Sequence, residues 1–182
     1  MRDGLRKQYI SIICYLIMKF IKLAPNQIIT LNDFPLYNEQ ILKIYYSVYK
    51  NGCGRIIPPC PVIHKNLVRH IFNKSLKLKL EKFEKKNPKA EYFLLDGSHK
   101  TTAACLTNNK IKAMVFKSDR DIIEAKKLVE IGKLFSLTVG KTIEDNIDIL
   151  NKHFRKRPYF ETVEEKTKKM IRKKSILPYM NH

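Results

Sequence analysis

The order of apolar and polar residues predicts alternating helices and strands through the central part of the chain. In residues 38–52, apolar side chains stand three and four positions apart, which makes one apolar face of a helix, and Asn51-Gly52 is a typical helix end. Residues 56–63 are also apolar but contain three prolines. Prolines exclude a central ladder position, so this stretch is predicted to be an extended edge strand. The residues of the helical face are Ile41, Ile44, Tyr45, Val48 and Tyr49.

Residues 64–90 form a basic stretch that separates two predicted strands. It contains nine Lys and Arg residues but only two Glu. Leu76, Leu80 and Phe83 have the spacing of one helical side, and Asn87-Pro88 marks the end of that helix. The pattern therefore predicts a basic, helical insertion.

Two further strands and several helices are predicted after this insertion. Residues 92–95 are apolar and aromatic, as in a buried strand, and residues 111–116 form a second short strand. Three helices should follow, because Ser118, Thr142 and Thr162 each stand three residues before an acidic residue, which is the pattern of an N-terminal capping box. The apolar face of the second of these helices is Ile143, Ile147, Leu150 and Phe154, and Pro178 is predicted to end the last one.

This pattern predicts a mixed α/β fold, of α+β type, with a helical C-terminal extension. The expected division is a core at 28–117 with its basic insertion at 64–90, an extension at 118–182, and an N-terminal segment at 1–27 whose role is open. At 182 residues, the chain is long enough for one domain with a substantial core.

The net charge of the chain bears on what it could bind. The formal net charge is +19, from 36 Lys and Arg against 17 Asp and Glu. Such a surface attracts polyanions, so nucleic acid is one candidate partner. A generally lysine-rich composition explains the charge equally well. The basic segment 166–174 is interpreted as the solvated face of a helix.

The cysteines and the N-terminus indicate a cytoplasmic protein. Cys14, Cys53, Cys60 and Cys105 form no closely spaced pair, so reduced thiols are expected rather than a zinc site or disulfides. The apolar run 10–18 follows basic residues but is too short to span a bilayer, and no small-residue cleavage site follows it. It is expected to be a first strand or helix of the fold, unless translation begins at Met18.

The chemistry of the chain concentrates in "EYFLLDGSHKTTAACL", residues 91–106, where a strand turns sharply into a helix. A helix that starts directly after a strand presents unpaired N–H groups and a partial positive charge, which suits phosphate. Gly97 permits close approach, and Asp96 can cap the turn or hold a metal ion that bridges phosphates. The side chains suited to phosphate contact are Ser98, His99, Lys100, Thr101 and Thr102. The alternative is an ordinary Asp-Gly turn with a threonine cap.

The segment "FLLDGSHKTTAACLTNNKIKAMVF" resembles the signature of the ParB/sulfiredoxin superfamily. There, a strand runs into Asp-Gly-x-His-Arg or a close variant, and an alanine-rich helix and a short strand follow. The resemblance extends upstream to "ILKIYYSVYKNGCGRIIPPCPVI", where a helix ending in Gly precedes a proline-containing strand. It covers about residues 28–116, interrupted by the basic insertion, and implies a nucleotide whose phosphates lie at the helix start.

The variants of this motif imply different chemistries. Sulfiredoxins have a reactive cysteine between the Gly and the His, where this chain has Ser98, so thiol chemistry is not expected. Partition-type ParB proteins have Gly-Glu-Arg-Arg, bind CTP and continue into a DNA-reading helix-turn-helix. The most similar variant is the Asp-Gly-His-His-Arg of nucleotide-dependent free-serine kinases. Here Ser98 and Lys100 depart from it, and lysine binds phosphate without the fork of arginine.

The resemblance to these kinases implies phosphoryl transfer from ATP or ADP, with Mg²⁺, to a small hydroxyl-bearing substrate. CTP remains an alternative nucleotide. Asp96, His99 and Lys100 would surround the phosphates, with Asp96 and His99 in catalytic roles. Glu39 would be the base, although it can equally be a first-turn carboxylate favoured by the helix dipole. The rival interpretation is a DNA-binding, nucleotide-switched or nuclease-like protein, and the oligomeric state is left open.

Overall fold

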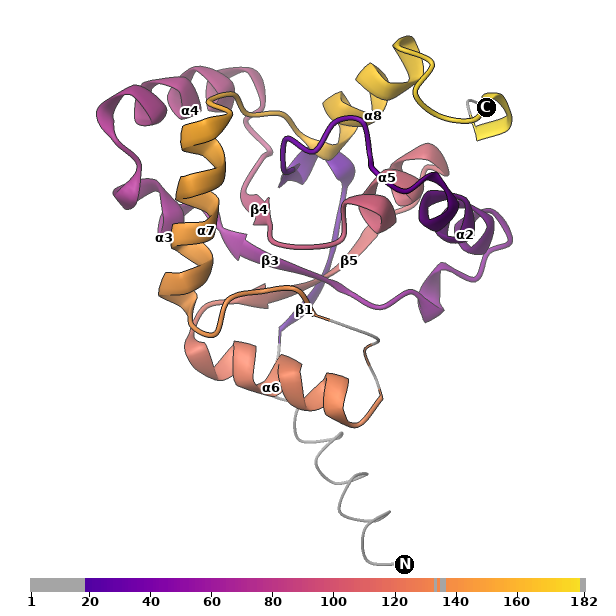
Figure 1. The fold of residues 1–182 in the computed structure, drawn as a ribbon, viewed down its shortest axis with the longest axis horizontal. Helices are drawn as coiled ribbons and strands as arrows, with labels where there is room; N and C mark the ends of the chain where they lie inside the picture. Colours follow the sequence, from indigo (N-terminus) through magenta and orange to yellow (C-terminus); the bar gives the residue numbers. More distant parts are fainter. Residues whose placement is uncertain (1–18, 133, 135–136, 181–182) are drawn as a thin grey trace, which may run out of the picture.

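A mixed five-stranded sheet, in the order β1-β5-β3-β4-β2, forms the centre of the described part of the chain (Figure 1). The computed structural model describes residues 19–132, 134 and 137–180. The strands are β1 (Phe20–Leu23), β2 (Ile28–Ile29), β3 (Cys60–His64), β4 (Tyr92–Leu94) and β5 (Ile111–Phe116). The α-helices are α2 (Glu39–Lys50), α3 (Lys65–Val68), α4 (Lys74–Lys86), α5 (Ser98–Leu106), α6 (Asp119–Glu130), α7 (Ile143–Lys156) and α8 (Val163–Arg172). This arrangement confirms the mixed α/β class with helical segments at its C-terminal end.

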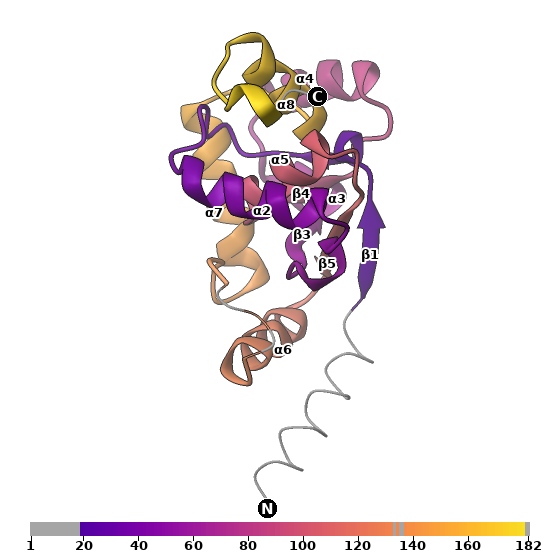
Figure 2. The same ribbon diagram turned by 90° about the vertical axis from the view of Figure 1, so that its right-hand side faces the viewer.

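Alternation along the strands sends apolar side chains to both faces of the sheet. Val62 and Leu94 face the layer of α2, α5 and α8, and share one apolar cluster with residues of these helices. Their neighbours Ile63 and Phe93 face the opposite way, into the cluster formed with α3, α4 and α7. Both faces are therefore buried, and helices cover them on two sides (Figures 1 and 2).

The basic insertion is helical, as predicted. It consists of α3, a 3-10 turn at Arg69–Ile71, and α4. Leu76, Leu80 and Phe83 are buried on the inner side of α4, while lysines occupy its outer side. The insertion is thus a cover for one face of the sheet.

The prediction that the proline-containing stretch is an edge strand is wrong, because β3 is the central strand. Pro58 and Pro59 precede the strand, and only Pro61 lies within it. Pairing with β4 begins at Val62, and the carbonyl of Pro61 accepts a hydrogen bond from the N–H of Leu95, at 3.0 Å. Pro61 is therefore tolerated because it stands where the β4 ladder starts.

The three capped helices at the C-terminal end are confirmed as α6, α7 and α8, each with a capping box at Ser118, Thr142 or Thr162. The last helix ends at Arg172, however, and not at Pro178, which begins a short 3-10 turn. Helices α7 and α8 pack on opposite faces of the sheet. The described part of the predicted extension is therefore packed into both halves of the core.

The apolar run 10–18, predicted to be a first strand or helix, lies outside the described residues. The first described strand is β1, an edge strand that pairs antiparallel with β5. None of the helices in the described ranges has both the length and the apolar character needed to cross a membrane.

Candidate functional site

The turn from β4 into α5 is tightly packed and requires a glycine. Gly97 adopts φ +106° and ψ +31°, in the left-handed region that L side chains rarely adopt. A Cβ at this position would lie 2.8 Å from the Sγ of Cys60 and 3.0 Å from the Cε of Lys100. The turn therefore lies directly against the start of the central strand β3.

The first turn of α5 has no side-chain cap, in contrast to every other α-helix in the described ranges. The N-terminal N–H groups of α2, α3, α4, α7 and α8 are capped by Asn38, His64, Asn73, Thr142 and Thr162, and α6 has the Ser118–Asp121 box. At α5 the N-cap residue is Gly97, which has no side chain. The free N–H groups and positive dipole end of α5 are therefore available to an anion.

His99, the second residue of α5, is buried, and one of its two ring nitrogens has no hydrogen-bond partner within the described residues. Its side chain is only 8% exposed, and its Nε2 atom is buried without a hydrogen-bond partner. Burial lowers the pKa of His99, while the nearby carboxylate of Asp33 partly opposes this shift. A buried polar atom without a partner is destabilising, so a ligand that bonds to Nε2 would remove this cost.

The start of α2 lies beside His99 and completes this surface. The ring of Tyr37 contacts the imidazole edge-on, with centroids 5.1 Å apart, although Tyr37 is 84% exposed. The backbone carbonyl of Asn38 also faces His99 and favours its protonated form. Glu39 follows directly as the exposed first residue of α2. The structure thus brings the predicted base and the predicted phosphate turn to two neighbouring helix starts.

The other predicted residues of the turn divide into two groups. Ser98 is 8% exposed, like His99, and Lys100 is partly exposed; both stand in the first turn of α5. Thr101 is fully buried, and its hydroxyl donates to the carbonyls of Gly97 and Ser98, both at 3.1 Å. Thr102 is also buried. The predicted phosphate contacts of these two threonines are therefore corrected, because their side chains belong to the helix interior and the core.

Asp96 connects the turn to the segment before α7. Its carboxylate accepts a hydrogen bond from the backbone N–H of Thr138, at 3.4 Å. In the described ranges, no three His, Cys, Asp or Glu side chains gather as a metal site. A Mg²⁺ ion at Asp96 would therefore need phosphate oxygens and water as its remaining ligands, which is the usual arrangement for this ion.

Cys60 is the thiol behind the turn, and it is unsuited to nucleophilic chemistry. It is buried, and burial raises its pKa to about 11, although Lys100 acts in the opposite direction. The thiol is therefore protonated at neutral pH, whereas a reactive cysteine needs a thiolate.

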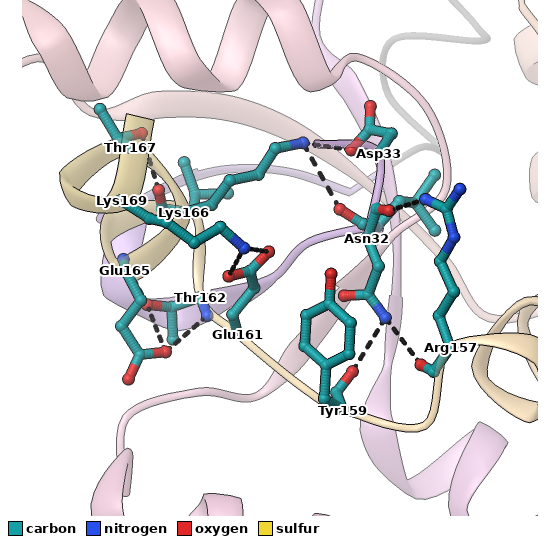
Figure 3. Close-up of polar contacts among 12 residues, drawn as sticks. Asn32, Asp33, Arg157, Tyr159, Glu161, Thr162, Glu165, Lys166, Thr167 and Lys169 are labelled. Atoms are coloured by element: carbon teal, nitrogen blue, oxygen red, sulfur yellow. Dashed lines mark hydrogen bonds and ion pairs between the residues drawn. The ribbon is translucent and has the colours of Figure 1, made fainter. Parts of the chain in front are cut away.

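Sequence reasoning missed an ion pair close to His99. Lys166 of α8 is only 1% exposed and pairs with Asp33, in the segment that leads to Tyr37 (Figure 3). Burial lowers the pKa of Lys166, and Asp33 opposes this shift. The charges of both residues also act on His99. The prediction that 166–174 is a solvated face is therefore wrong for Lys166. Its partner, Asp33, lies 133 residues earlier in the sequence.

Residues between His153 and Lys169 hold the segment 30–33 through several more contacts (Figure 3). Asn32 donates from its side-chain amide to the carbonyls of Arg157 and Tyr159, at 2.8 and 2.9 Å. Its backbone N–H donates to Nε2 of His153, at 2.9 Å, and Arg157 donates to its carbonyl. Lys169 pairs with Glu161, at 2.7 Å. We refer to residues 30–33 together with 153–169 as the α7–α8 junction.

The chain matches no family model, and searches of curated proteins and of solved structures found no match. The resemblance to the ParB/sulfiredoxin superfamily thus depends on the motif and the order of elements alone.

Proposed function

We propose that this protein binds the phosphates of a nucleotide at the start of α5 and transfers a phosphoryl group to a small hydroxyl-bearing substrate. The observation that carries the proposal is the unpartnered, buried Nε2 of His99 at a helix start without a side-chain cap. Two independent features, an open helix start and a buried polar atom without a partner, thus meet at one turn.

Phosphate suits this turn better than other small groups do. The free N–H groups of α5 are donors, Lys100 adds a full positive charge, and Ser98 can donate its hydroxyl. His99 can supply a further donor from Nε2. Hydrogen bonds to charged groups contribute about 1.5–3 kcal/mol each, so a few of them give useful affinity. ATP and ADP are the nucleotides to test first, with CTP as the alternative.

Glu39 is the residue proposed to assist transfer. It is exposed beside the turn, as the first residue of α2. As a base, its carboxylate would accept the proton of the substrate hydroxyl while that oxygen bonds to phosphorus and the bond from phosphorus to the leaving nucleotide oxygen breaks. Asp96 would hold Mg²⁺ together with the phosphates. Lys100 and His99 would neutralise the charge of the phosphates.

Binding is tested by thermal unfolding of the purified protein with ATP, ADP and CTP, each with and without Mg²⁺. A nucleotide at a hundred times its Kd adds about 2.7 kcal/mol of stability, which is readily visible as a rise in Tm. Lys100→Ala and His99→Ala should abolish most of this rise and change the Tm of the free protein little. Lys79→Ala, on the exposed side of α4, is the control and should keep the full rise.

The binding proposal is wrong if no nucleotide changes the Tm of the wild-type protein. If the two variants at the turn unfold without ligand, the turn has a purely structural role.

Transfer is tested separately, with ATP or ADP, Mg²⁺ and a panel of small hydroxyl-bearing metabolites, and phosphorylated products are detected by mass spectrometry. Glu39→Gln should retain nucleotide-induced stabilisation and lose product formation. Product formed at the wild-type rate by Glu39→Gln would exclude Glu39 as the base. If the wild-type protein binds nucleotide but forms no product with any substrate, the transfer part of the proposal fails and the binding part stands.

A further inference from the structure

The outer face of α4 carries a row of lysines that no acidic residue balances. The helix lies at the edge of the molecule in both views (Figures 1 and 2). Five of its lysines are exposed, and within the described residues none of the five forms an ion pair with a carboxylate. We call this set the α4 ridge: Lys74, Lys79, Lys82, Lys85 and Lys86.

The two glutamates of α4 do not offset the charge of the ridge, because both are paired with cations of the preceding segment. Glu81 pairs with Arg69, at 3.1 Å. Glu84 pairs with Lys65, at 3.2 Å, and with Arg69, at 3.4 Å. These partners belong to α3 and to the 3-10 turn that follows it. The negative charges of α4 are therefore neutralised on the side of the helix that faces this turn.

The charges of the ridge are unfavourable for the helix itself. Helices α2, α6, α7 and α8 each have an acidic residue in the first turn, which the helix dipole favours. Helix α4 has none there, and its first residue is Lys74, a cation at the positive end of the dipole. Lys82 and Lys86 stand four residues apart, where like charges repel. A polyanion bound along α4 would relieve both effects.

An open hollow of about 400 Å³ lies beside the N-terminal half of α4. It is lined by Asn66, Arg69, His70 and Lys77, and none of these residues is acidic. The basic surface is therefore wider than the ridge alone.

The length and composition of α4 suit the backbone of a nucleic-acid duplex. The helix has 13 residues, which at 1.5 Å per residue makes it about 20 Å long. This length equals the rise of about six base pairs, so lysines on successive turns can reach successive phosphates. Proteins that bind single strands stack bases on exposed aromatic side chains. The one aromatic residue of α4, Phe83, is buried, so a duplex fits better than a single strand.

We propose that the α4 ridge binds the phosphate backbone of double-stranded nucleic acid without reading its sequence. Lysines supply point charges to phosphates, and such contacts carry no sequence information. The surface is separate from the proposed nucleotide turn, because α4 packs on one face of the sheet and α5 on the other. The proposal therefore does not depend on the proposed function.

The test measures binding of the full-length protein to a fluorescently labelled DNA duplex of mixed sequence, about 24 base pairs long, by fluorescence anisotropy between about 50 and 200 mM salt. The ridge variant Lys74→Gln/Lys82→Gln/Lys85→Gln neutralises three exposed lysines of α4. A second variant, Lys74→Arg/Lys82→Arg/Lys85→Arg, keeps the charge at the same positions. A single strand of the same length and vesicles rich in phosphatidylserine are the comparison ligands.

The control variant is Lys43→Gln/Lys110→Gln/Lys117→Gln. It removes three exposed lysines away from α4, one on α2 and two that flank β5. It lowers the net charge of +19 by the same three units as the ridge variant. A difference between these two variants therefore reports the position of the charges and not their number.

We expect the wild-type protein to bind the duplex with an affinity that falls steeply as salt rises, with a slope of log K against log salt of about −4, which corresponds to about four or five phosphate contacts. The ridge variant should lose at least about tenfold in affinity at about 100 mM salt, and its slope should be shallower by about two to three. The control should stay within about threefold, and the arginine variant should bind like the wild-type protein. The Tm of the free ridge variant should not fall, because its substitutions are exposed and remove like-charge repulsion.

Several results would overturn the proposal. One is an absence of duplex binding at the lowest salt. Another is an equal loss of affinity in the ridge variant and the control, which would mean a diffuse effect of net charge. Tighter binding of the single strand than of the duplex would also contradict it. Binding of the vesicles through the ridge, without binding of the duplex, would identify a lipid-binding surface instead.

Discussion

The starts of α5 and α8 meet the same physical requirement in opposite ways. Each presents unpaired N–H groups at the end of a strand or loop. At α8, Thr162 and Glu165 satisfy them reciprocally: the hydroxyl of Thr162 accepts from the N–H of Glu165 at 3.1 Å, and Glu165 accepts from the N–H of Thr162 at 2.8 Å. At α5, Gly97 offers no side chain, and Nε2 of His99 has no partner.

The difference separates a structural role from a binding role. At α8, cap and charges are matched within the protein, so their removal should reduce stability and leave ligand binding unchanged. At α5 the polar groups are left unmatched, so changes there should reduce ligand binding more than stability. Gly97 is the exception, because its backbone conformation is part of the fold.

The largest effect is expected from Lys166→Ala in the α7–α8 junction. This change leaves the carboxylate of Asp33 without its buried partner and opens a cavity in the core. We expect a loss of about 4 kcal/mol in the free energy of unfolding, measured by urea denaturation. The control is Lys168→Ala, which removes an exposed lysine of the same helix and should change stability little. Equal effects of the two variants would contradict a buried pair.

Gly97→Ala should follow, because the new methyl group meets Cys60 in a backbone conformation unfavourable for alanine. We expect a loss of about 2–3 kcal/mol. Gly52→Ala is the matched control, since Gly52 also has a positive φ, +73°, but open space at the Cβ position. That variant should lose about 1 kcal/mol. If the two variants are equally stable in denaturant, the turn is not closely packed against β3.

Thr162→Ala should cost about 1 kcal/mol by removing the cap of α8. The rise in Tm with saturating nucleotide should remain that of the wild-type protein. A smaller rise would show that the α8 start contributes to binding, and the distinction between the two helix starts would then fail.

The smallest effect on stability is expected from lowering the pH. Burial lowers the pKa of both His99 and His153 in the folded protein. The unfolded chain therefore binds protons more readily, and stability present above the unfolded pKa of about 6.5 is lost as the pH falls toward the folded values. Protonation of His153 also disrupts its acceptor bond from Asn32. We expect the fall in Tm between about pH 7 and pH 5 to be smaller in His153→Gln and His99→Gln than in the wild-type protein.

Bound nucleotide should change the acid sensitivity that His99 contributes but not the part that His153 contributes. Phosphate next to His99 favours its protonated form, so bound nucleotide should reduce the acid sensitivity that depends on His99 and leave the part that depends on His153. Thermal unfolding of the wild-type protein and of His153→Gln, each with and without nucleotide at about pH 7 and pH 5, measures this, because His153→Gln retains only the contribution of His99. If nucleotide protects both contributions equally, the phosphate does not lie at His99.

Much of the fold could be predicted from the sequence because it depends on local patterns. The capping boxes at Ser118, Thr142 and Thr162 involve residues only three apart, and the strand Ile111–Phe116 is apolar except for Lys112. The central place of β3 could not be predicted, since it depends on where β4 begins to pair relative to Pro61. The two-residue strand β2 carries too little pattern to be recognised.

Some residues of the candidate site could likewise be predicted from the sequence, and others could not. Gly97, His99 and Lys100 could be predicted because the turn is contiguous in sequence, and Glu39 came from the resemblance. Asp33 and Lys166 could not be predicted, because a lysine in a lysine-rich helix has no local mark of burial. Only packing of α8 against the segment after β2 reveals this pair.

The α7–α8 junction has a consequence for how the protein is made. The segment that carries Asp33, Tyr37 and Asn38 toward His99 is held by residues 153–169. A ribosome synthesises that segment early and its holding residues more than a hundred positions later. The nascent chain can therefore form α2 and α5 before it can fix the segment that borders His99, and the candidate site is assembled only once α8 has emerged.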